Sequence, residues 1–175
     1  MENITLTGGK YRGRKVLTPG GTTHPMGSRE RLALFNMLTG KLEGARVLDA
    51  FAGSGALGIE ALSRGASSVV FVDKNRRATE VIWDNLAELG IESGIEVICE
   101  KVSNVSGTVD SFDIVLADPP YDDFDLSEVE CLSGLIEKDG ILVLSHPSEA
   151  PEFDGFLLLK TRTYAAAHLS IYTKN

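Results

Sequence analysis

The stretch Arg46-Val-Leu-Asp-Ala-Phe-Ala-Gly-Ser-Gly-Ala-Leu-Gly58 decides the fold. Its first half, residues 46–51, predicts a buried strand, and a helix is expected from about Leu57 to Ser63. The glycines between them fit the pattern G-x-G-x-x-G, and Asp73 ends the next apolar run. Glycines let a backbone approach a ligand closely, and a carboxylate after the second strand can bind ribose hydroxyls. The spacing therefore predicts a loop that binds a nucleotide-like cofactor.

Strands and helices alternate on both sides of this loop. Strands are expected at 3–7, 14–17, 46–51, 68–73, 95–100, 112–118, 140–145, 156–162 and 166–173, and helices from Ser28 as cap to about Leu38, at 57–63, over apolar positions 78–89 before Gly90, and at 126–138. Such alternation predicts an α/β fold, with a mostly parallel sheet covered on both faces and a terminal hairpin. Residues 1–40 form a small hairpin and helix extension, and residues 41–175 form the main domain.

Composition excludes several classes of protein. The 175 residues are 43% hydrophobic and 24% charged, which is typical of one globular domain. No apolar run approaches the ~18 residues of a membrane span, and the N-terminus has no features of a secretory signal. Cys99 and Cys131 fit no metal or redox spacing, and the three histidines form no cluster. We therefore expect a cytoplasmic protein with reduced thiols, no metal and no membrane partner.

Charge is distributed unevenly along the chain. The net charge is −8, which by itself disfavours a polyanionic partner. Residues 1–35 nevertheless hold six basic side chains against two acidic ones, namely Lys10, Arg12, Arg14, Lys15, Arg29 and Arg31 against Glu2 and Glu30. Both solvated surface charge and a patch for a phosphate backbone fit this distribution.

Asp49 distinguishes between two kinds of cofactor. It lies four residues before Gly53, at the end of the first strand of the motif. A carboxylate there would repel a pyrophosphate, and it would favour a ligand that carries an amino group and a sulfonium. S-adenosylmethionine (AdoMet) is such a ligand, so the motif suits AdoMet better than NAD.

A second motif, Asp118-Pro119-Pro120-Tyr121, follows the strand at 112–117. In a doubly wound sheet it lies in the same crevice as the glycine loop. The Asp118 carboxylate and the Pro119 carbonyl can accept hydrogen bonds from the exocyclic amine of a nucleobase, and the prolines fix these acceptors. Tyr121 can stack on an extruded base. The tetrapeptide predicts methyl transfer to such an amine.

Both motifs together resemble one family. The run from Asp49 to Ala66, which continues the glycine loop as Glu-Ala-Leu-Ser-Arg-Gly-Ala, is similar to that of the RsmD-type 16S ribosomal RNA guanine-N2 methyltransferases, as are Asp118–Tyr121 and the N-terminal glycines and arginines. The resemblance implies a Rossmann-like class I AdoMet-dependent fold with seven strands. It also implies methylation of a guanine N2 in 16S rRNA, with the small ribosomal subunit or a late assembly intermediate as substrate. Because chain length and composition demand no partner copy, we expect a monomer.

The resemblance also assigns site residues. Catalytic roles fall to Asp118, Pro119, Pro120 and Tyr121; AdoMet contacts fall to Asp49, Phe51, Ala52, Gly53, Ser54, Gly55, Asp73, Lys74, Lys101 and Val102; RNA contacts fall to Arg12, Arg14, Arg29 and Arg31. The chain departs from the family pattern at His24-Pro25-Met26, where Arg-Pro-Thr is usual, and at Leu32, where Glu is usual.

Three alternatives remain open at this point. A DNA or RNA adenine-N6 methyltransferase uses the same tetrapeptide chemistry, although the short interval between Gly55 and Asp118 leaves little room for a target-recognition insert. An NAD-dependent oxidoreductase would have to tolerate Asp49. A non-catalytic ribosome assembly factor could retain the fold without the reaction.

Overall fold

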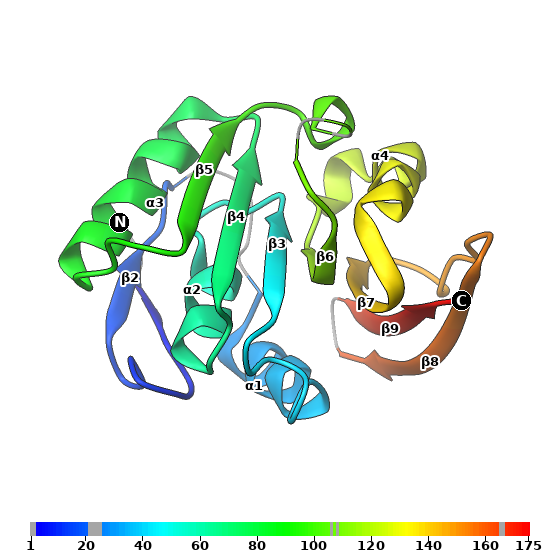
Figure 1. Ribbon diagram of the computed structural model, residues 1–175, viewed down its shortest axis with the longest axis horizontal. Helices are drawn as coiled ribbons and strands as arrows, with labels where there is room; N and C mark the ends of the chain where they lie inside the picture. The colour runs from blue at the N-terminus through cyan, green and yellow to red at the C-terminus, as the bar shows by residue number, and fades with distance from the viewer. Residues whose placement is uncertain (1–2, 21–25, 106, 108, 165–166) are drawn as a thin grey trace.

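The computed structural model describes residues 3–20, 26–105, 107, 109–164 and 167–175. The strands and longer helices, in chain order, are β1 Asn3–Thr5, β2 Lys15–Leu17, α1 Ser28–Met37, β3 Arg46–Ala50, α2 Ala56–Ser63, β4 Ser68–Asp73, α3 Arg76–Glu88, β5 Ile95–Cys99, β6 Phe112–Ala117, α4 Leu126–Glu130, β7 Ile136–His146, β8 Phe156–Thr163 and β9 His168–Lys174. Short 3-10 helices follow β5, β6 and α4, at Val102–Asn104, Tyr121–Asp123 and Cys131–Leu135. Figure 1 shows these elements as one layered body.

Seven strands form the central sheet, in the order β5-β4-β3-β6-β7-β9-β8. The pairs from β5 to β7 are parallel, whereas β9 pairs antiparallel with both β7 and β8. β3 and β6 are neighbours, with Asp49 opposite Leu116 and Ala50 opposite Ala117. The predicted fold class and the predicted antiparallel hairpin at residues 156–173 are therefore confirmed within the described residues. The adjacency of β3 and β6 brings the ends of both motif strands together.

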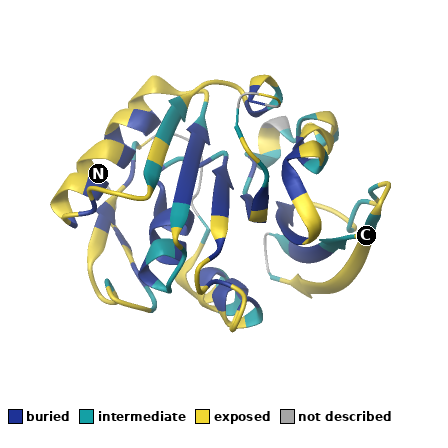
Figure 2. Cartoon of the chain, in the orientation of Figure 1, coloured by how far each residue is buried: buried dark blue, intermediate teal, exposed yellow. Residues whose placement is uncertain are grey.

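Alternating strand residues divide the core into two layers. On one face, Val47, Phe71 and Leu116 pack with residues from α1, α2 and α3. On the other face, Leu48, Val72 and other strand residues pack beneath α4 and the 3-10 helices around it. Figure 2 shows buried residues along the inner strands β3, β4, β6 and β7, whereas the edge strand β8 is exposed. This two-faced burial explains why the strands read as nearly continuous apolar runs.

The N-terminal hairpin is packed against α2 through its glycine turn. The Lys10 N–H donates to the Ser63 carbonyl at 2.7 Å. Gly9 has φ 73°, and a Cβ there would lie 1.8 Å from the same carbonyl oxygen, so only glycine fits. Ile4, Leu34 and other apolar residues of this extension belong to the same core cluster as the sheet. The extension thus shares its core with the rest of the molecule.

Two local predictions are wrong. The expected helix at 126–138 ends as a 3-10 turn at Leu135, and β7 already begins at Ile136. β7 contains an irregularity at Asp139, whose φ is 63°, beside a register shift in the β6–β7 pairing. Gly27 caps α1, and no side chain makes the cap hydrogen bond, so Ser28 is not the cap. His24 and Pro25 lie outside the described residues.

Candidate active site

The glycine loop connects β3 to α2 by a tight turn. Gly55 caps α2 in the left-handed conformation with φ 76°, and Phe51 also has a positive φ of 61°. Asp49 is buried beneath this turn, where its Oδ2 accepts the Gly58 N–H at 2.8 Å. A Cβ at Gly58 would lie 2.4 Å from the Phe71 ring, so the glycine is required for α2 to approach β4. The third glycine of the motif therefore serves the packing that orients Asp49.

Three carboxylates converge on this loop. Asp73 accepts the Gly53 N–H at 2.8 Å through Oδ2 and the Asn75 N–H at 2.8 Å through Oδ1. Burial raises the pKa of Asp49 well above its ordinary value, and the charges of Asp118 and Asp73 raise it further against the Gly58 hydrogen bond. Such a cluster favours a positively charged ligand and opposes a pyrophosphate.

This chemistry fits AdoMet, whose sulfonium and ammonium groups are cationic. The space above Gly53 is open, since a Cβ there would meet no atom within 4 Å. Ser54 uses its hydroxyl to accept the Ala56 N–H at 3.3 Å, and Ala52 is buried. The Ala52 N–H donates to the Val72 carbonyl, and the Ala52 carbonyl accepts the Gly55 N–H, so the assignment of Ala52 and Ser54 to the cofactor stays a prediction. AdoMet would be held by the loop, with Asp49 and Asp73 at either side.

The residues predicted to contact the cofactor after β4 and β5 differ in their exposure. Lys101 is exposed and stands at the start of the 3-10 helix, whereas Val102 is buried in the second core cluster. The Val102 side chain therefore packs inward, and only its backbone is available to a ligand. Lys74 is exposed beside Asp73. The assignment of Lys74, Lys101 and Val102 to the cofactor stays a prediction.

The second motif begins where β6 ends. Asp118 is partly exposed, Pro119 is buried, and Pro120 caps the 3-10 helix that carries Tyr121. Burial raises the pKa of Asp118 to about 6, and a hydrogen bond with Ser145 opposes this rise. The Tyr121 hydroxyl also hydrogen-bonds Ser145. Ser145 thus connects the carboxylate and the phenol, and at neutral pH Asp118 is an ionised hydrogen-bond acceptor.

A cavity of about 130 Å³ opens beside this motif. Its polar lining includes Asp118, Tyr121 and Ser145 from the carboxyl ends of β6 and β7, together with Glu30 from α1. The turn between β8 and β9 closes another side through Tyr164. The cavity therefore joins the second motif, the N-terminal extension and the C-terminal hairpin at one place.

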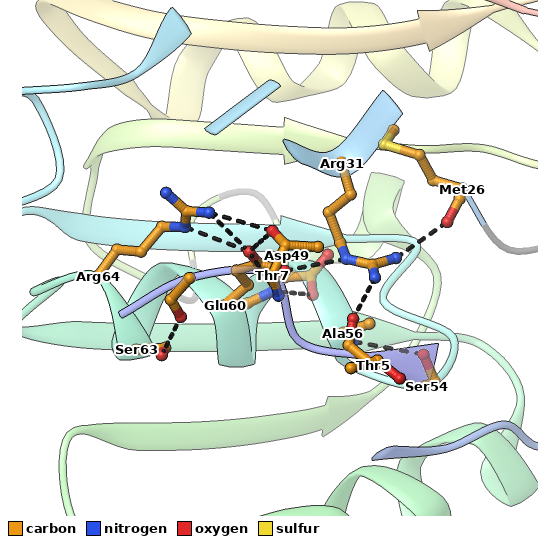
Figure 3. Close-up of polar contacts among 12 residues, drawn as sticks. Thr5, Thr7, Met26, Arg31, Asp49, Ser54, Ala56, Glu60, Ser63 and Arg64 are labelled. Carbon is orange, nitrogen blue, oxygen red and sulfur yellow. Dashed lines mark hydrogen bonds and ion pairs between the residues drawn. The ribbon is translucent and has the colours of Figure 1, made fainter. Parts of the chain in front are cut away.

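The four predicted RNA-binding arginines fall into two groups. Arg12, Arg14 and Arg29 are exposed, and the Arg14 guanidinium donates to the Glu88 carbonyl at 3.2 Å. The prediction for Arg31 is wrong, because its side chain is 2% exposed. It donates to Glu60 at 2.9 Å, to the Met26 carbonyl at 3.0 Å and to the Thr5 carbonyl at 2.6 Å, as Figure 3 shows. Its donors are directed inward, so no phosphate can reach them.

Sequence reasoning missed two functional positions. Ser145 follows the apolar run of β7, and a polar residue at the carboxyl end of a strand beside β6 is the signal that could have found it. In the sequence, Glu60 stands out only as part of the family motif. It is fully buried and accepts hydrogen bonds from Thr7, Arg31 and Arg64 (Figure 3). Within the described residues, no group of three or more side chains could hold a metal ion, and no helix has the length and apolar character to cross a membrane.

The sheet order, the glycine loop and the acidic strand ends together define a Rossmann-like methyltransferase fold. A solved structure, a putative methyltransferase (yhhF) from Escherichia coli, superimposes with a TM-score of 0.87 at 29% identity, covering 99% of this chain and 98% of that one. The family model described as conserved hypothetical protein 95 matches residues 4–173. The chain therefore belongs to this family, the RsmD family of methyltransferases.

Two relatives match along nearly their whole length. A putative rRNA methyltransferase (YlbH) from Bacillus subtilis is 33% identical over 98% of this chain and 99% of the relative. The ribosomal RNA small subunit methyltransferase D from Haemophilus influenzae is 30% identical over 97% of this chain and 93% of the relative. The resemblance inferred from the two motifs is confirmed, and the oxidoreductase alternative finds no support in either the carboxylate cluster or these relatives.

Proposed function

We propose that the protein methylates the exocyclic N2 of a guanine in 16S rRNA, using AdoMet, within the small ribosomal subunit or a late assembly intermediate. One observation carries the reaction: β3 and β6 are parallel neighbours with Ala50 opposite Ala117, so Asp118 follows the strand beside the one that leads into the glycine loop. A hydrogen-bond acceptor for the amine and the glycine loop for the cofactor thus share one crevice. The substrate class is supported by the names of the relatives from B. subtilis and H. influenzae.

The residues of the second motif would activate a weak nucleophile. The lone pair of the N2 amine is delocalised into the base, so the amine needs acceptors that favour the charge developing at nitrogen. The ionised Asp118 and the Pro119 carbonyl would accept its two hydrogens and fix its direction. Tyr121, held by Ser145, would pack against the base. The proton released from N2 would pass to Asp118 or to solvent.

When bound, AdoMet supplies an electrophilic methyl group on a sulfonium sulfur, which becomes a thioether once the methyl has moved. Asp49 and Asp73 would hold its cationic and ribose ends, as their positions around the loop suggest. Gly53 would allow the close approach, because the space above it is open. The protein would thus contribute alignment and charge complementarity, with no need for a strong base.

The decisive experiment measures methyl transfer from labelled AdoMet to unmodified small subunits, naked 16S rRNA and duplex DNA, with the modified nucleosides identified by mass spectrometry. We expect N2-methylguanosine from the subunits. Asp118→Ala should lower the rate about 10²–10³-fold while AdoMet still binds. The exposed variant Glu92→Gln serves as the control.

Other results would overturn parts of the proposal. N6-methyladenine would keep the mechanism and replace the substrate. If no substrate is methylated although AdoMet binds, the non-catalytic assembly factor becomes the better interpretation. Equal activity of Asp118→Ala and the unmodified protein would remove Asp118 from the reaction.

A further inference from the structure

Glu30 brings a second carboxylate to the cavity that contains Asp118. It is the third residue of α1, and it is partly buried. Its carboxylate folds back toward Gly27, where a Cβ would lie 2.2 Å from Glu30 Oε2. A side chain at position 27 would therefore displace the carboxylate from the place it occupies. The glycine at the start of α1 leaves room for an acid that lines the cavity.

Both carboxylates line the same cavity as the phenol of Tyr121. After burial, the charges of Asp118 and Glu30 both raise the pKa of Tyr121, against the hydrogen bond with Ser145. Asp118 follows β6 and Glu30 belongs to α1, so two separate parts of the chain bring acceptors to the wall of the same cavity. A ligand that carries two neighbouring donors would satisfy both.

Among the standard bases, only guanine carries an amino group beside a protonated ring nitrogen on its pairing edge. Adenine and cytosine carry an acceptor nitrogen beside their amino group. Enzymes that act on an extruded base read this edge by hydrogen bonds. A site built to bond a donor rejects an analogue that lacks it, because a buried polar group is left unpaired.

We propose that Glu30 is a specificity-determining residue, which accepts the guanine N1–H while Asp118 holds the N2 amine in the same cavity. This inference rests on the proposed function and names the group that would select guanine over adenine. An adenine whose amine bonds Asp118 would turn its N1 lone pair toward the Glu30 carboxylate, and the two would repel.

Glu30 also stands at the N3 position of α1, where a glutamate can reach back to the cap. Glutamine supports the cap in the same way, so Glu30→Gln keeps this structural role. The amide replaces one acceptor with a donor, so the side chain can also donate to an unprotonated ring N1, and the preference for N1–H is weakened. Glu30→Gln therefore separates recognition of the base from stability of the helix.

The test uses small subunits reconstituted from 16S rRNA that carries guanosine or 2-aminopurine riboside at the methylated position. 2-Aminopurine keeps the N2 amine and lacks the N1–H. The unmodified protein should prefer guanosine by at least ~10²-fold in kcat/KM. Glu30→Gln should reduce this ratio about 10-fold or more, by losing activity on guanosine and gaining it on 2-aminopurine.

Controls keep this test independent of folding and of the proposed function. Glu30→Gln should retain its melting temperature and its AdoMet affinity, and Glu92→Gln should change neither activity nor ratio. Glu30→Ala should lose activity on guanosine without gaining any on 2-aminopurine. If the unmodified protein forms N2-methylguanosine and Glu30→Gln keeps the same ratio, the inference is wrong although the function stands. If the unmodified protein forms no N2-methylguanosine, the proposed function itself fails.

Discussion

At the scale of single residues, Asp118 and Ser145 form the pair on which the proposed reaction depends. Burial raises the pKa of Asp118 to about 6, while the hydrogen bond with Ser145 lowers it. The protonated carboxyl is a poorer acceptor for a nucleobase amine than the carboxylate. Activity should therefore be present above the pKa of Asp118 and be lost as pH falls through it.

The first prediction concerns this loss of activity at low pH, which is the acid limb of the pH–activity profile. We expect kcat/KM to fall about tenfold per pH unit below pH about 6, as one group is protonated. Ser145→Ala removes a hydrogen bond that favours the carboxylate, so it should move the limb to higher pH. The measurement is kcat/KM from pH 4.5 to 8.5, and the exposed Ser148→Ala is the control. A limb that stays in place in Ser145→Ala would contradict the role of this bond.

Motif residues could be predicted from the sequence because their positions follow from strand ends. Asp49, Asp73 and Asp118 each close an apolar run, and parallel strands end at the same edge of a sheet. Arg31 could not be placed in this way. It looks like one more cation of a basic segment, and its partner Glu60 lies 29 residues away. Burial of a long-range ion pair leaves no local pattern.

At the scale of elements, α2 is the point at which the N-terminal extension meets the glycine loop. Glu60 on α2 accepts hydrogen bonds from Thr7 after β1, from Arg31 on α1 and from Arg64, the residue that caps α2 (Figure 3). The Arg31 and Glu60 side chains are 2% and 0% exposed. Because Gly55 caps the same helix, these contacts also hold the glycine loop in place.

The second prediction follows from this buried pair. Arg31→Leu leaves Glu60 without its buried partner and should lower the free energy of unfolding by about 3–5 kcal/mol. Arg29→Leu, two residues earlier in α1 and exposed, should change the free energy of unfolding by less than about 0.5 kcal/mol. Urea unfolding followed by circular dichroism measures both. Equal stability of the two variants would show that the pair contributes nothing.

Most helices and strands could be predicted because each is long enough to show the apolar spacing that is typical of its type. The apolar spacing of α3 and its end before Gly90 is one example. The prediction of one helix over 126–138 is wrong because the sequence keeps helical spacing through both α4 and the 3-10 helix, at Leu126, Val129, Leu132 and Leu135. The change to β7 at Ile136 is imposed by pairing with β6, a tertiary contact that the local sequence does not carry.

At the scale of the whole molecule, the proposed RNA partner must approach a protein of net charge −8. The exposed cations Arg12, Arg14 and Arg29 belong to the N-terminal extension, whereas Arg31 is occupied internally. Local attraction near the extension must therefore outweigh general repulsion. Such attraction depends strongly on salt.

The third prediction is a change in this salt dependence. The triple variant Arg12→Gln, Arg14→Gln, Arg29→Gln should weaken binding to small subunits and reduce the slope of log K against log salt by about 2–3. The triple variant Lys41→Gln, Arg46→Gln, Lys138→Gln changes the charge equally outside the N-terminal extension, before and at the start of β3 and within β7. Its slope should remain unchanged. Equal losses in both variants would indicate a general charge effect without a defined docking surface.

The order of the strands also determines when this molecule can become active during its synthesis. β9 lies between β7 and β8, although the ribosome makes it after both. Leu169 pairs with Ser145, and residues 167–169 line the cavity. β7 and β8 must therefore wait, unpaired with each other, until β9 has left the exit tunnel. The cavity beside Asp118 therefore gains its complete wall only after β9 has been released.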